Sequence, residues 1–306
     1  MPMAHAVINK HREMIMNNSS TPSTPTGDNS TPTGGNSTHS TRPSTGRQIL
    51  DIALYLVMML LIQFVVMAGG AKIYALVTGQ TSINPLTNGN LMVGLTLLYS
   101  VVVGAVFMAL RWSPFSRSYM QKRPWAVLIW TALLALGSIP LADAISSLSH
   151  AKMPLEELQL LTTIVMHPWG WIAVGVLVPI AEEMVFRGAI LRTLLNLCGH
   201  RWRWGAIVLS ALLFGLAHGN MAQLLNASLM GCLLGWLYYR SGSIAPGIVF
   251  HIVNNSVAVL LVRMMPGSAD MQLIDLFAGD TPRLILFLLC ALCVFVPSLW
   301  QLRQRL

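Results

Sequence analysis

Apolar residues occur along this chain in long runs, not in the alternation with polar residues that soluble strands and helices show. Most runs reach the roughly 20 residues that an α-helix needs to cross a bilayer. We therefore predict eight membrane-spanning helices, near residues 50–70, 90–111, 125–147, 169–196, 204–218, 221–240, 243–264 and 283–302. The pattern predicts an all-α, polytopic membrane bundle.

Two of these runs are irregular. The run 169–196 is long and is interrupted by charged residues, whereas the run 204–218 is barely long enough to cross. We expect a break near Pro179, or a short helix over 204–218, because one of these is needed to bring polar groups from neighbouring spans to the same depth.

The charged residues between the runs alternate in sign. The connections 111–123 and 192–203 are basic, whereas 150–159 and 266–280 lean acidic. Because cytosolic loops of membrane proteins are enriched in Lys and Arg, this alternation predicts that both termini are cytosolic. We expect an integral, multi-pass protein of a prokaryotic plasma membrane.

Composition agrees with a membrane location. Hydrophobic residues make up 54% of the chain and charged residues 10%, far from the roughly 25% charged residues of an average soluble domain. The net charge of +8 is placed where it can meet anionic lipid. No basic, aromatic-rich domain lies outside the apolar runs, so the expected partner is the lipid bilayer and not nucleic acid.

The domain division follows from a change in composition. Residues 17–46 consist almost entirely of Ser, Thr, Pro, Gly and Asn and contain an imperfect repeat, which is too little apolar surface to form a core. We interpret residues 1–47 as a disordered tail and residues 48–306 as the transmembrane helical domain. The residues that carry chemistry lie at about 170–260.

Two adjacent carboxylates are the most unusual feature of that region. Glu182 and Glu183 follow the apolar run "WGWIAVGVLVPI", and Arg187 comes one helical turn later. A charge at membrane depth is costly and therefore marks a functional candidate. Glu183 and Arg187 share a helix face and can form a structural ion pair, which leaves Glu182 free on another face. The alternative is that the whole group lies at a helix end in the headgroup region.

Two later runs carry polar groups at the same spacing. Phe214 and His218 lie one turn apart in "LLFGLAHGN", and His251 and Asn255 lie one turn apart in "GIVFHIVNNSVAVLL". Glutamate and two histidines can bind a divalent metal such as zinc. The same groups can also work without metal, with Glu182 as the general base for water and other members polarising a carbonyl. The residues leave both options open.

These motifs resemble the CAAX prenyl endopeptidase and bacteriocin-processing (CPBP, or Abi) family of intramembrane proteases. The family pattern E-E-x-x-x-R, F-x-x-x-H and H-x-x-x-N is present in order as "EEMVFR", "FGLAH" and "HIVNN". The resemblance implies an endopeptidase that cleaves a membrane-associated protein or peptide, in some members a prenylated CAAX-type substrate.

The resemblance also implies a role for each matching residue. Glu182 corresponds to the carboxylate that activates water, with His218 as its partner, and His251 and Asn255 correspond to groups that polarise the carbonyl. In the metalloprotease interpretation Glu182, His218 and His251 hold the metal. Glu183 and Arg187 match the family's second glutamate and its arginine.

Two other functions remain open at this point. A member of the family without catalytic activity can act as an immunity protein, a scaffold or a partner-binding protein. Acidic and histidine residues at membrane depth can also form the proton relay of a coupled transporter, although the chain shows no internal repeat that would favour one.

Overall fold

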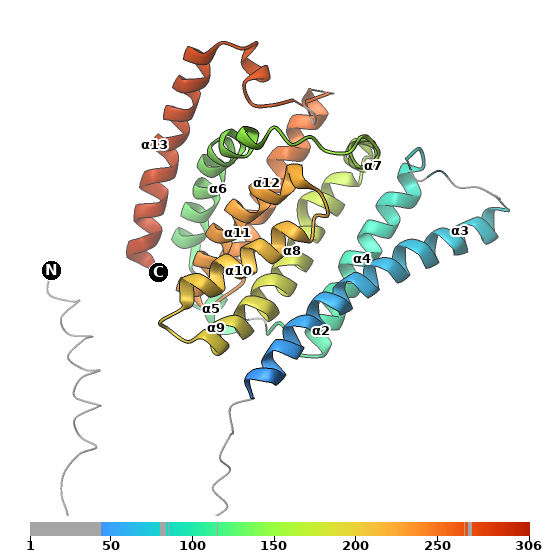
Figure 1. The fold of residues 1–306 in the computed structure, drawn as a ribbon, viewed down its shortest axis with the longest axis horizontal. Helices are drawn as coiled ribbons and strands as arrows, with labels where there is room; N and C mark the ends of the chain where they lie inside the picture. Colours follow the sequence, from blue (N-terminus) through green and yellow to red (C-terminus); the bar gives the residue numbers. More distant parts are fainter. Residues whose placement is uncertain (1–43, 80–83, 85, 115, 266, 269–270) are drawn as a thin grey trace, which may run out of the picture. The chain divides into compact units, whose positions relative to one another are not determined.

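The computed structural model describes residues 44–79, 84, 86–114, 116–265, 267–268 and 271–306. Within these ranges the chain is helical and forms no strand, which confirms the predicted all-α bundle (Figure 1). The elements, in chain order, are α2 (Thr45–Phe64), η1 (Val65–Gly69), α3 (Gly70–Thr78), α4 (Gly89–Ala109), α5 (Arg117–Gln121), α6 (Trp125–Ser146), η2 (Ser147–Ser149), α7 (Leu155–Met166), η3 (Trp171–Leu177), α8 (Val178–Glu183), η4 (Met184–Leu191), α9 (Arg192–Cys198), α10 (Arg203–Leu216), α11 (Met221–Ser241), α12 (Ala245–Met264), η6 (Asp275–Phe277) and α13 (Thr281–Arg305).

The first helix begins within the segment that the sequence assigns to the tail. Ser44 accepts a hydrogen bond from the backbone N–H of Arg47 and caps α2, so Thr45 to Arg47 are helical. The rest of the predicted tail, residues 1–43, lies outside the described residues. Both the start of α2 and the end of α13 lie at the same end of the helical unit (Figure 1).

The number of full-length spans is smaller than predicted. In the described residues six helices are long and apolar enough to cross a membrane, or up to seven if one bent pair is counted as a single span. The bent pair is Leu155–Met166 and Trp171–Cys198, whose axes differ by 102°. The helix over 204–218 is α10, which has only 14 residues. The prediction of eight spans therefore counted one helix that is too short to cross.

The sharp bend between α7 and η3 is fixed by polar contacts from α12. His167 has extended backbone geometry and ends α7. The guanidinium of Arg263, in the last turn of α12, donates to the carbonyl oxygens of Val165 at 2.8 Å and His167 at 2.6 Å. The carbonyl oxygen of His167 also accepts from the backbone N–H of Gly170 at 2.9 Å, so Arg263 and this turn together satisfy the end of α7.

Packing inside the unit centres on the span that contains the two glutamates. The segments α8 and η4 contact α2, α4, α10, α11 and α12, and their apolar side chains form the main buried cluster. On the other side of the unit α6 packs against α12 and α13 around a second, smaller cluster. The glutamates therefore lie where the largest number of helices meet.

Candidate active site

The span that carries the glutamates alternates between π-helix and α-helix. The π-helices η3 and η4 flank α8, and all the flanking dihedral angles stay in the right-handed helical region. Pro179 lies in the first turn of α8 and has no backbone N–H to donate to the preceding turn. A π-helix is rare and is often found at functional sites. The predicted irregularity near Pro179 is thus a change of helical pitch without a break in the backbone.

Arg187 is buried in η4 and makes contacts on three sides. Its guanidinium donates to Glu183 Oε1 at 2.8 Å and to the carbonyl oxygen of Gly231 at 3.2 Å. It also lies over the ring of Phe214, with Cζ 4.5 Å from the ring centroid. Both Arg187 and Glu183 have no exposed surface. The pair is therefore inside the protein, and its burial is offset by charge pairing and a cation–π contact.

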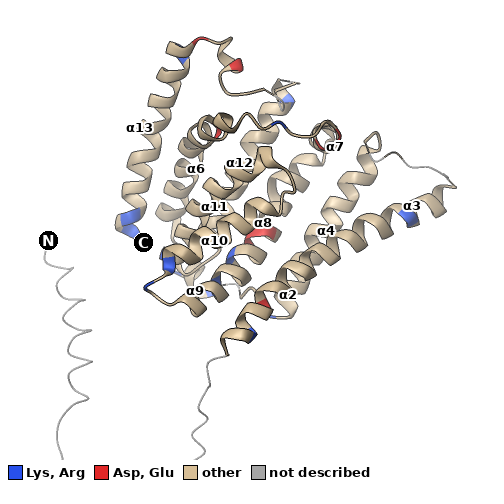
Figure 2. Ribbon diagram, in the orientation of Figure 1, with Lys and Arg blue, Asp and Glu red and all other residues tan. Residues whose placement is uncertain are grey.

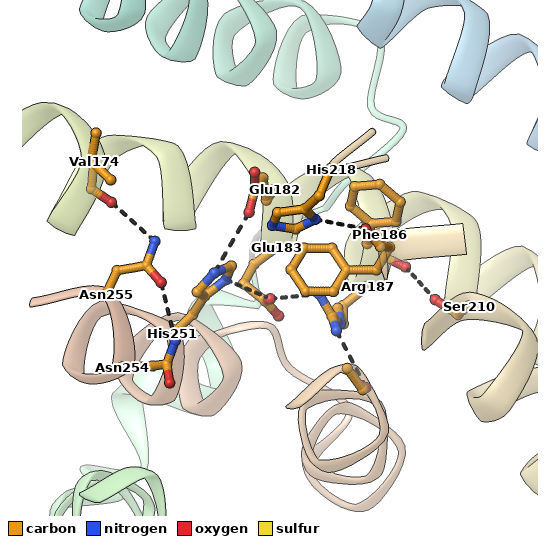
Figure 3. Close-up of polar contacts among 12 residues, drawn as sticks. Val174, Glu182, Glu183, Phe186, Arg187, Ser210, His218, His251, Asn254 and Asn255 are labelled. Atoms are coloured by element: carbon orange, nitrogen blue, oxygen red, sulfur yellow. Dashed lines mark hydrogen bonds and ion pairs between the residues drawn. The ribbon is translucent and has the colours of Figure 1, made fainter. Parts of the chain in front are cut away.

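His251 lies between the two glutamates. Its Nδ1 is 3.2 Å from Glu183 Oε1, and its Nε2 is 3.5 Å from Glu182 Oε2. A contact chain therefore runs from Arg187 through Glu183 and His251 to Glu182 (Figure 3). Because a carboxylate can only accept, Nδ1 carries the proton toward Glu183, and this fixes the ring so that Nε2 faces Glu182.

Phe214, from the second motif, contacts three of the polar side chains of the cluster. The Phe214 ring contacts His218 and His251 edge to face, at centroid distances of 5.1 and 5.6 Å. The guanidinium of Arg187 lies over the face of the same ring. One turn later His218 Nδ1 lies 3.0 Å from the Phe214 carbonyl oxygen, to which it donates. In the neutral ring Nε2 of His218 is then the nitrogen with a free lone pair.

The four motif residues are only partly brought together. His218 and His251 both contact the ring of Phe214, and Glu182 contacts His251. The sequence paired Glu182 with His218, whereas the closest histidine nitrogen to Glu182 is Nε2 of His251.

Asn255 differs from its expected position. Its Nδ2 donates to the carbonyl oxygen of Val174 in η3 at 3.1 Å, and its Oδ1 accepts from Asn254 at 3.2 Å (Figure 3). One turn of helix separates it from His251, but its amide is turned toward the π-helix and not toward the glutamates. In this structure Asn255 satisfies a carbonyl of η3, which needs partners from outside the helix where the pitch changes.

Two glycines of the site carry no signal in the sequence motifs. Gly247, at the start of α12, leaves room for Glu183, since a Cβ there would lie 2.5 Å from Glu183 Oε2. Gly231, on α11, supplies the carbonyl for Arg187. Glycines inside apolar runs indicate close helix packing in membranes, and this is the signal that could have found them.

The residues predicted to bind a metal do not fit that role as they are arranged. In the described part of the chain no group of three or more His, Cys, Asp or Glu side chains could hold a metal ion. Nε2 of His251 lies 3.5 Å from Glu182 Oε2, and Nδ1 of the same ring lies 3.2 Å from Glu183 Oε1. His218 does not join this pair as a third ligand in the arrangement described.

Fold and site together define a polytopic helical membrane protein with a buried carboxylate–histidine cluster. Residues 164–257 match the family described as type II CAAX prenyl endopeptidase Rce1-like. This match confirms the resemblance to the CAAX protease family over that segment, which contains all three motifs. No curated protein and no solved structure matches the chain.

Proposed function

We propose that this protein is an intramembrane endopeptidase in which Glu182 activates the water that cleaves the peptide bond. The observation that carries the proposal is the contact chain from Arg187 to Glu182 inside the bundle. Three of its charged or titratable groups are buried among apolar helices and the fourth, Glu182, is partly buried, which is costly unless they serve a function. The match of residues 164–257 to a family of prenyl endopeptidases supports the same reaction class.

The contact chain assigns a different task to each glutamate. Arg187 neutralises Glu183, and Glu183 in turn orients His251, so this carboxylate is a positioning group. Glu182 contacts only the Nε2 side of His251, and its side chain is 21% exposed. Since Glu182 can be reached by water and has no arginine of its own, it is the carboxylate that can take a proton.

The reaction can be written with these groups alone. Glu182 removes a proton from water, and the water oxygen forms a bond to the peptide carbonyl carbon. In this mechanism His251 carries a proton on both ring nitrogens, so Nδ1 donates to Glu183 while Nε2 donates a hydrogen bond to the carbonyl oxygen as it becomes negative. The C–N bond then breaks, and the proton that Glu182 took from the water moves to the leaving amine nitrogen, either directly or by way of the lone pair on Nε2 of His218.

The test is cleavage by the purified protein of fluorogenic peptides that differ only in a C-terminal prenyl group. Glu182→Gln keeps the shape and removes the base, so we expect a fall in rate of about 10²- to 10⁴-fold with unchanged thermal stability. The matched control is Glu156→Gln, which makes the same change at an exposed carboxylate of α7 and should leave the rate unchanged.

Chelator treatment is the second arm of this test. Because the described residues form no group of three metal ligands, we expect the cleavage rate to be the same before and after chelator treatment. Loss of activity that zinc restores would contradict the metal-free mechanism but not the endopeptidase. A folded wild-type protein that cleaves no peptide, or a Glu182→Gln variant at the wild-type rate, would overturn the proposed function in favour of a binding or scaffold protein.

A further inference from the structure

The span that carries the glutamates is closed on one side of the cluster and open on the other. From Glu183 through Leu191 every residue is buried. Glu182 itself and the residues 176–178 before it are partly exposed. On this span the exposed surface next to Glu182 therefore lies on the η3 side and not on the α9 side. The end where η3 and α7 lie is thus the nearer one from which Glu182 can be reached.

A series of polar groups leads from the cluster toward α7. His218 lies in the connection between α10 and α11, and Asn220 follows two residues later. The Nδ2 group of Asn220 donates to Oε2 of Glu157, on the first turn of α7, at 2.8 Å and to Oε1 of Gln223 at 2.8 Å. These side chains are exposed or partly exposed. At this end polar groups continue from His218 to the surface.

The end that carries α7 has fewer positive charges than the opposite end. Its acidic residues are Asp143, Glu156, Glu157, Asp275 and Asp280, which lie at the end of α6, on α7 and in the connection before α13, and its basic residues include Lys152, Arg263 and Arg283 (Figure 2). Two of its arginines are already engaged, because Arg263 caps α7 and Arg283 pairs with Asp280 at 3.0 Å.

The opposite end is rich in arginine. The connection from α4 to α6, the connection from α9 to α10 and the last turn of α13 all lie there (Figure 1, Figure 2). They hold Arg111, Arg117, Lys122, Arg123, Arg201, Arg203, Arg303 and Arg305. Cytosolic connections of membrane proteins carry the excess of Lys and Arg, so this end is the one expected in the cytosol.

We propose that the cluster opens to the extracytosolic side of the membrane, and that its substrate is a peptide segment presented there. That the ligand is a substrate rests on the proposed function, whereas the side of access is argued from burial and charge alone. The side of access distinguishes two classes of substrate. A prenylated C-terminus of a cytosolic protein would reach the arginine-rich end, whereas an exported or extracytosolic juxtamembrane segment would reach Glu182 directly.

The first experiment measures access and needs no activity. The four cysteines Cys198, Cys232, Cys290 and Cys293 are free and are replaced by alanine. Single cysteines are then introduced as Glu182→Cys, as Ser149→Cys at the α7 end and as Ser118→Cys at the arginine-rich end, the last two at exposed positions. Spheroplasts are treated with a membrane-impermeant maleimide, before and after permeabilisation.

The expected result is that Ser149→Cys and Glu182→Cys are labelled in intact spheroplasts, whereas Ser118→Cys is labelled only after permeabilisation. If the Glu182→Cys variant folds poorly, Met221→Cys is used in its place. It replaces a 70% exposed residue three positions after His218 and should also be labelled in intact spheroplasts. Labelling of Glu182→Cys or Met221→Cys only after permeabilisation would overturn the inference.

The second experiment separates this inference from the proposed function. A membrane-anchored reporter peptide is co-expressed with the wild-type chain in two forms, with its cleavable segment outside or in the cytosol. Cleavage of the outside form alone is expected. Cleavage of the cytosolic form alone would overturn the side of access but support the endopeptidase. Cleavage of neither form, together with labelling from outside, would overturn the endopeptidase and leave the side of access intact.

Discussion

The helices α11 and α13 are both long and apolar enough to cross a membrane, but the more apolar of the two is the less buried. The most apolar window of α13 has a mean hydropathy of 2.3 and is 11% buried within the protein, whereas that of α11 has a mean hydropathy of only 1.2 and is 33% buried. The more apolar helix is therefore the more exposed one. In a bilayer, exposed apolar side chains face lipid, which is as favourable for them as a protein interior.

The difference teaches what holds the site together. Lipid provides no hydrophobic driving force between helices, so α11 is held by close backbone approach and by polar contacts. A Cβ at Gly231 would lie 2.9 Å from Cβ of Ala211, and a Cβ at Gly235 would lie 2.9 Å from Ile207 Cγ2. The same stretch of α11 supplies the carbonyl that binds Arg187. Hydropathy alone identifies α13, whereas small and polar residues identify the helices of the site.

The largest effect should come from breaking the buried ion pair. Arg187→Ala leaves Glu183 as an unpaired buried charge and should lower the free energy of unfolding by about 3–5 kcal/mol. Folded yield and activity should fall together, measured by thermal unfolding in detergent and by peptide cleavage. The control is Arg283→Ala, which breaks an exposed pair with Asp280 and should cost about 1 kcal/mol or less. An Arg187→Ala protein as stable as this control would contradict the buried pair.

A smaller loss should follow from filling the space beside Glu183. Gly247→Ala places a Cβ against Glu183 Oε2, so the carboxylate has to move, at a cost of about 1–3 kcal/mol. Gly94→Ala is the matched control, since a Cβ on this helical glycine of α4 meets nothing within 4 Å. It should raise stability by up to about 1 kcal/mol. Thermal unfolding of the two variants side by side would show opposite signs; equal signs would mean that Gly247 has free space.

Loss of the contact between Asn255 and the π-helix η3 should lower the free energy of unfolding by a still smaller amount. Asn255→Ala removes the hydrogen bond to the Val174 carbonyl and should cost about 0.5–1.5 kcal/mol. Asn254→Ala, which removes only the bond to Asn255, should cost less. Stability and cleavage rate are both measured. If Asn255→Ala abolishes cleavage while thermal stability stays at the wild-type value, Asn255 acts on the substrate and not on η3.

The smallest effect is expected at the lipid-facing surface. Leu286→Ala, at a position of α13 that is 64% exposed, should change stability by about 0.5 kcal/mol or less. Leu302→Ala on the same helix removes a fully buried side chain and should cost about 2–5 kcal/mol. Similar losses for both leucines would mean that α13 is covered by protein over its whole length.

The helical class and the motif chemistry were accessible from the sequence because both are local. An apolar run of span length needs no knowledge of its neighbours, and the i, i+4 spacing of Glu183 and Arg187 defines a pair on one helix face. The family resemblance is carried by three short motifs, and residues 164–257 contain all of them.

What the sequence could not supply is contact between distant residues. His251 and Glu183 are 68 residues apart, so nothing in either motif shows that Glu183 orients this histidine. Asn255 and Val174 are 81 residues apart, and their bond turns the amide away from the glutamates. The hydropathy pattern places the start of the span that carries the glutamates near residue 169 but does not predict the helix α7 before it, nor the 102° bend at which Arg263 binds two carbonyls.

The π-helices on either side of Glu182 also limit how this protein can change during evolution. A π-helix closes its hydrogen bonds over five residues instead of four, so it holds an extra residue in each turn. A one-codon deletion between Glu183 and Arg187 would shorten the spacing of the ion pair from four residues to three, although no residue of the motifs had been substituted. The length of this stretch therefore matters to the site as much as the identity of its residues.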